Sequence, residues 1–99
     1  MPWRVADLEI TPDDLVSARL SNGTEAIDVL AFLHMTQRTA TLRGMHIQGG
    51  GRNTMGLPAL RALAHWLKEY LDVDELRIEG ATRTSGSGPG RRPAPLVFR

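Results

Sequence analysis

The chain has 99 residues, of which 41% are hydrophobic and 23% are charged, and its formal net charge at pH 7 is +1. This composition is typical of one folded domain, so we expect a single domain over residues 1–99. The absence of cysteine excludes disulfides, cysteine zinc sites and thiol catalysis. No apolar run reaches the ~18–20 residues of a membrane-spanning helix, and the N-terminus lacks the pattern of a signal peptide.

Strands are predicted for the first half of the chain. Apolar and polar residues alternate over residues 3–10 and 16–20, on either side of a turn at 11–14. A longer stretch, about 25–35, is apolar on both sides, which predicts an interior position in the sheet. A further strand is expected over about 40–47.

The connection between the second and third strands is predicted to be a tight hairpin. Asn22-Gly23 is a favoured pair for a two-residue turn. Such a turn would pair Ala18 with Ile27, and it would place apolar side chains together on one face.

One helix is predicted, from about Pro58 to Leu71, because leucine and alanine recur there at helical spacing. Leu63 and Leu67 should lie against the sheet. A glycine-rich loop precedes the helix and a strand over about 76–80 follows it. The order β-β-β-β-α-β predicts an α+β domain, with one main helix packed on a mostly antiparallel sheet of about five strands.

Basic residues concentrate at the C-terminal end. Residues 77–99 contain five arginines and one acid, whereas residues 1–76 contain seven basic and ten acidic side chains. Guanidinium groups suit phosphate or carboxylate partners, although codon preference in a genome rich in G and C would produce the same arginine bias. The total charge is too small for a protein that binds nucleic acid by charge alone.

Three histidines are candidates for proton transfer. His65 shares a helix face with charged residues, which favours a solvent-exposed position, and His34 ends a strand beside a turn. His46 lies in a strand two residues before the glycine-rich loop, where the strand can fix a catalytic side chain and the loop can admit substrate. A core histidine bonded to a carbonyl is the alternative. Since no two histidines have ligand spacing, we predict no metal site, and we predict no cofactor.

Residues 40–80 resemble the acetyl-coenzyme-A-binding core of the GNAT family of N-acetyltransferases. That family's loop pattern is Arg/Gln-x-x-Gly-x-Gly/Ala; Gln48 and Gly51 match it, whereas Asn53 replaces the last glycine or alanine. The resemblance implies that loop amides bind the pyrophosphate of the coenzyme. Only 19 residues follow Gly80, too few for the helix and two strands that usually complete that fold. An acetyl-CoA-binding domain is therefore our second hypothesis.

The most distinctive segment is 81–95, which is rich in glycine, proline and arginine. Its arginines can neutralise a phosphate, and its hydroxyls and loop amides can donate hydrogen bonds to the phosphate oxygens. A solubilising turn and tail is the alternative. We predict a functional loop here.

The pattern from Gly80 to Pro93, after a leucine-rich helix, resembles the C-terminal toxin modules of bacterial polymorphic toxins, the variable tips of RHS-type proteins. The resemblance covers about residues 40–98. It implies a small nuclease, and one fold of these modules, the barnase–EndoU–colicin–RelE type, has a helix packed on an antiparallel sheet and cleaves RNA without a metal. It also implies interbacterial competition, an immunity protein as partner, and delivery to the target-cell cytoplasm as the tip of a secreted protein.

We therefore predict a toxin domain that acts as an endoribonuclease. The catalytic residues are predicted to be His46, Arg83 and Thr84. The predicted substrate-binding residues are Ser85, Arg91, Arg92 and Arg52. The acid–base partner of the histidine would be a hydroxyl or Glu79. A non-catalytic binding module or an immunity protein is the third hypothesis.

Overall fold

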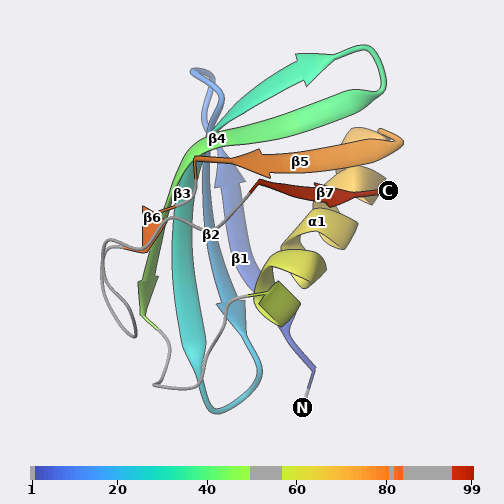
Figure 1. The fold of residues 1–99 in the computed structure, drawn as a ribbon. Helices are drawn as coiled ribbons and strands as arrows, with labels where there is room; N and C mark the ends of the chain where they lie inside the picture. The colour runs from blue at the N-terminus through green and yellow to red at the C-terminus, as the bar shows by residue number, and fades with distance from the viewer. Residues whose placement is uncertain (1, 50–56, 81, 84–94) are drawn as a thin grey trace.

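The computed structural model describes residues 2–49, 57–80, 82–83 and 95–99 (Figure 1). The elements are β1 (Arg4–Ile10), β2 (Leu15–Ser21), β3 (Ala26–Thr36), β4 (Thr39–Gly49), α1 (Leu57–Leu71), β5 (Glu75–Glu79), β6 (Thr82–Arg83) and β7 (Leu96–Phe98). The strands form one sheet in the order β1-β2-β3-β4-β5-β7, and β6 pairs with β4.

The predicted fold class is confirmed. Strands β1 to β4 form an antiparallel meander. The chain then crosses through α1 to β5, which pairs parallel with β4, and β7 pairs antiparallel with β5. The helix lies along one face of this mostly antiparallel sheet (Figure 1). In the described part of the chain, α1 has neither the length nor the apolar character of a membrane-spanning helix.

The hairpin between β2 and β3 has a longer loop than predicted. Ser21 pairs with Ala26, so Ala18 faces Val29 and the predicted register is wrong by two residues. The side chain of Asn22 stabilises this loop, because its Oδ1 accepts a hydrogen bond of 2.7 Å from the backbone N–H of Glu25. Because side chains alternate between the two faces of a strand, a register shift of two residues leaves every side chain on its predicted face.

The core lies between α1 and the face of the sheet that carries Leu20, Leu42 and Ile78. Leu63 and Leu67 are fully buried there, which confirms their predicted contact with the sheet. Burying one leucine side chain stabilises a fold by about 1.5–3 kcal/mol, so this helix face contributes much of the stability of a small domain.

A left-handed residue ends the helix. Asp72 has φ 55°, and the N–H of Asp72 donates to the carbonyl of Glu69 while that of Val73 donates to the carbonyl of Lys68. This pair of bonds is the Schellman arrangement, which satisfies the last carbonyls of a helix. Val73 is buried, so the turn also directs the chain back into the core before β5.

The face of the sheet opposite α1, which no described element covers, is called the open face. Strand β3 is interior to the sheet, as its apolar residues on both sides predicted. Its Leu30 and Phe32 nevertheless lie on the open face, where they are 40% and 59% exposed. The open face therefore carries apolar as well as polar side chains.

Candidate functional site

A β-bulge in β4 determines which of its side chains reach the open face. Phe32 pairs with Arg43 and Leu30 with His46, so two residues of β4 lie opposite one residue of β3. Gly44, within the bulge, has φ 60°, a left-handed conformation that glycine adopts without steric cost. Figure 1 shows β4 bending between the end that pairs with β5 and the end that pairs with β6.

The bulge directs His46 to the open face. Strict alternation would place His46 on the same face as the buried Leu42. Because of the extra residue, Met45 and Ile47 return to the core, and His46 is exposed. His46 is therefore not the buried core histidine that the sequence left open as an alternative.

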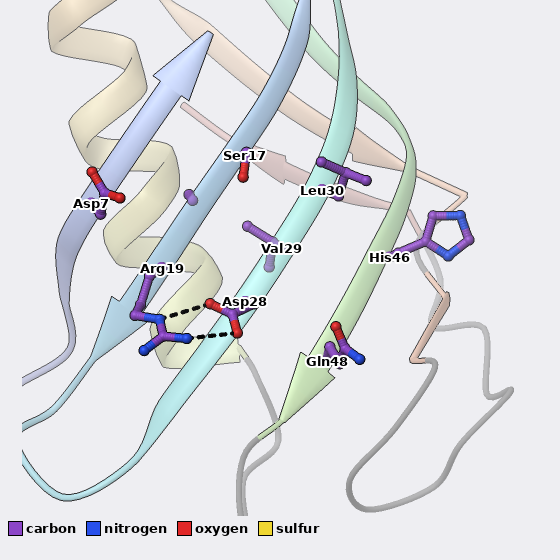
Figure 2. A pocket seen from close by; sticks show the side chains of 9 residues that line it. Asp7, Ser17, Arg19, Asp28, Val29, Leu30, His46 and Gln48 are labelled. Atoms are coloured by element: carbon purple, nitrogen blue, oxygen red, sulfur yellow. Dashed lines mark hydrogen bonds and ion pairs between the residues drawn. The ribbon is translucent and has the colours of Figure 1, made fainter.

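Side chains on the open face line a hollow of about 630 Å³ across β1 to β4 (Figure 2). Four residues that are successive register partners form one polar row across these strands: Asp7, Arg19, Asp28 and Gln48. The next row holds Ser17, Leu30 and His46. A second bulge, between Val5 and Asp7, brings the carboxylate of Asp7 into the polar row.

The guanidinium of Arg19, which carries the positive charge of the polar row, already forms an ion pair with Asp28. The guanidinium of Arg19 donates two hydrogen bonds to the carboxylate of Asp28, from Nε to Oδ1 at 2.9 Å and from Nη2 to Oδ2 at 3.1 Å. These hydrogen bonds, and the charge of Asp28, raise the pKa of Arg19 above its ordinary value, and Asp7 adds to the effect. The polar row therefore offers hydrogen-bonding groups rather than a free charge for a phosphate.

The surroundings of His46 differ from the polar row. Strand β6 pairs with β4 so that Thr82 is the register partner of His46 and Arg83 that of Ile47. Within the described residues, the imidazole of His46 has no hydrogen-bond or ion-pair partner, so both ring nitrogens are available to a ligand.

An ion pair lies one row away from His46. Arg43 and Glu79 are register partners on β4 and β5, and Nε of the arginine is 3.8 Å from Oε1 of the glutamate. Both side chains are substantially exposed, so the pair is weak and each group can turn to a substrate. A histidine, a carboxylate and a guanidinium thus lie on neighbouring positions of one face, which is a set suited to proton transfer beside a phosphate.

Most of the predicted phosphate-binding residues lie outside the described residues. These are Arg52, Thr84, Ser85, Arg91 and Arg92. The glycines of the expected coenzyme loop beyond Gly49 lie there too. Of the predicted site, the structure places His46 and the backbone of Arg83, and it places them on adjacent, paired strands.

The other two histidines lie away from the hollow. The side chain of His65 is 76% exposed, with Nε2 3.4 Å from Oε1 of Glu69, which confirms its predicted solvent-exposed position. Nε2 of His34 is 3.1 Å from Oγ1 of Thr36 at the end of β3. Among the described residues, no three histidine or acidic side chains are grouped to hold a metal ion.

The sequence prediction missed Arg43 as a site residue. The signal was present, since a glycine within a strand pattern suggests a bulge, and a bulge re-aims the side chains beside it. The polar row had no such signal, because its members come from four strands and meet only through their register.

Comparison of the chain with models of known protein families finds no match, and neither the curated proteins nor the solved structures include a significantly similar one.

Proposed function

We propose that this protein is a toxin domain that cleaves RNA by metal-independent acid–base chemistry. The observation that carries the proposal is the position of His46, Arg43 and Glu79 on neighbouring rows of the open face. The pairing of β6 with β4 also brings the backbone of Arg83 next to β4. Glu79 supplies a carboxylate in the adjacent row. Two proton-transfer groups and a cation are the parts that cleavage next to a 2′-hydroxyl needs.

The proposed reaction is an internal displacement at phosphorus. Glu79 accepts the proton of the 2′-hydroxyl, and the 2′-oxygen attacks phosphorus to form a 2′,3′-cyclic phosphate. The bond from phosphorus to the 5′-oxygen breaks, and protonated His46 donates its proton to that oxygen, which leaves as a 5′-hydroxyl. Arg43, which lies on the same face, stabilises the negative charge that develops on the phosphate oxygens, and Arg83 remains the second cation predicted for this role. This assignment uses a carboxylate as the general base and an imidazole as the general acid, two groups that commonly transfer protons in enzymes.

The experiment that tests the proposal is inducible expression in bacteria followed by inspection of total RNA. Cleavage that depends on His46 and Arg83 supports the ribonuclease. Intact RNA in cells that express the wild type would contradict it. Expression also separates a toxin from an immunity protein, because an immunity protein is harmless on its own.

The same proposal includes a neutralising immunity protein. Its binding surface should be acidic where it covers residues 81–92, since five of the twelve basic side chains lie in the last quarter of the chain. Delivery into the target cell as the tip of a larger secreted protein belongs to this proposal as well.

An acetyl-CoA-binding domain is the second candidate. The observation that favours it is the parallel pairing of β4 with β5 across α1, which is the strand–helix–strand unit that the resemblance predicted. The free N–H groups at the start of α1 would help to hold the pyrophosphate. Direct binding of acetyl-CoA distinguishes this candidate from the ribonuclease.

A further inference from the structure

Phe32 is the most exposed apolar side chain on the open face, with 59% of its surface accessible. It lies within β3, an interior strand, so its exposure does not follow from a place at the edge of the sheet. Next to it on the same strand face is Leu30, which is 40% exposed. Neighbouring apolar side chains on an otherwise polar surface commonly mark a binding site.

The ring of Phe32 lies against the bulge of β4. A Cβ atom added at Gly44 would be 4.0 Å from Cδ2 of the ring, so the ring stands beside the glycine backbone. Phe32 is the register partner of Arg43, and Leu30 is the partner of His46. Leu30 and Phe32 are two residues apart on one face of β3, so a ligand that covers both can contact the ring and the imidazole opposite Leu30.

The charges beside the ring suit a nucleotide. Arg43 lies 3.8 Å from Glu79, beyond hydrogen-bond distance, and within the described residues its guanidinium has no other partner. Its N–H groups can therefore donate to a phosphate while the adjacent aromatic ring holds a base. A flat ring next to a guanidinium is the combination by which proteins bind unpaired nucleotides.

We infer that Phe32 is the stacking residue for an unpaired nucleobase next to the cleaved bond, and that the substrate is single-stranded RNA. This inference rests on the proposed function and names its substrate class. The bases of an A-form duplex are stacked on each other and cannot reach a ring on a sheet face, whereas bases of single strands and loops can.

Binding to an oligonucleotide that cannot be cleaved tests the inference. The probe is a fluorescent single-stranded oligodeoxynucleotide, which has no 2′-hydroxyl, and its Kd is measured for wild type, Phe32→Ala, Phe32→Tyr and Tyr70→Ala. Stacking on an aromatic ring predicts that Phe32→Ala weakens binding by about 5- to 150-fold. Phe32→Tyr should bind like wild type. Tyr70→Ala is the matched control, since Tyr70 is a 65% exposed aromatic on α1, and it should change nothing.

The duplex form of the same probe should bind more weakly and without dependence on Phe32. A folded Phe32→Ala variant that binds the single strand as wild type does would overturn the inference and would point to a protein partner for this ring. Weak binding by both Phe32→Ala and Phe32→Tyr would overturn the stacking role as well. Should wild type bind the probe through Phe32 yet leave RNA intact, the ribonuclease fails and the stacking site stands. Should wild type cleave RNA with no dependence on Phe32, only this inference fails.

Discussion

Gly44 of β4 and Gly80, which directly follows β5, lie against each other, since a Cβ added at Gly80 would be 3.5 Å from the backbone nitrogen of Gly44. Both have left-handed backbones, with φ 60° and 66°. The register is the same before and after the two glycines: Arg43 pairs with Glu79, and His46 pairs with Thr82. Strands β5 and β6 therefore follow β4 through its bulge, and two glycines make this matched bend.

Substitution of Gly44 should destabilise the fold by an amount that follows the steric cost of a left-handed backbone for the new residue. We expect Gly44→Ala to lower the free energy of unfolding by about 1–2 kcal/mol and Gly44→Val by more, with Gly44→Asn the least harmful. The added Cβ meets only Phe32 Cδ2 at 4.0 Å, so crowding is not the cause. Urea unfolding measures the series. Equal stability of the valine variant and wild type would contradict the role assigned to this glycine.

Truncation of the buried helix face should cost far more than truncation of its exposed face. Leu63→Ala and Leu67→Ala should each lower the free energy of unfolding by about 2–5 kcal/mol, because both side chains are fully buried. Arg61→Ala on the exposed face is the control and should stay within about 0.5 kcal/mol. Thermal or urea unfolding separates the two cases, and similar losses at all three positions would contradict the packing described above.

Loss of a proposed catalytic group should stop RNA cleavage without unfolding the protein. We expect His46→Ala to slow cleavage by about 10²–10⁴-fold and Arg83→Ala by about 10²–10³-fold. His65→Ala is the control, as its imidazole is exposed on α1. Activity should also survive a chelator. The proposed site is wrong if the His46 and Arg83 variants both cleave as fast as the His65 variant.

Acid should weaken the attachment of the C-terminal strand. The carboxylate of Glu75 accepts hydrogen bonds from Arg77 and Arg99, and these lower its pKa below the ordinary value of 4.5. A carboxyl group whose pKa is lower in the folded state stabilises the fold above its unfolded pKa, and this contribution disappears as the pH falls through the folded value. Unfolding measured from about pH 6 downward should show a smaller acid-induced loss for Glu75→Gln than for wild type. Identical pH profiles would contradict the prediction.

Acetyl-CoA should leave the melting temperature unchanged at millimolar concentration if the ribonuclease proposal holds. A ligand that binds only the folded state raises the melting temperature in proportion to the logarithm of its concentration over Kd. A rise that follows this logarithmic dependence, and that is absent with a nucleotide lacking the pantetheine arm, would make the acetyl-CoA-binding domain the better proposal.

Local patterns were enough to locate the main elements. Period-two alternation and helical spacing of leucine reflect which side of a strand or helix is buried, and burial is the dominant stabilising term. The sequence left open whether His46 is exposed or buried, and the structure places it at an exposed strand position because of a bulge that was not predicted. The prediction of a two-residue turn at Asn22-Gly23 was wrong. The side chain of Asn22 accepts a hydrogen bond from the backbone N–H of Glu25 and so stabilises a longer loop.

Periodicity within single elements was enough to predict the fold class, the buried helix face and the solvent-exposed position of His65. The bulge at Gly44, the polar row and the pairing of β6 with the strand of His46 became visible only in the folded sheet. These depend on the register between strands, which no pattern within a single element shows. Register is a cooperative property of the whole sheet, because a shift of one residue moves every side chain of a strand to the other face.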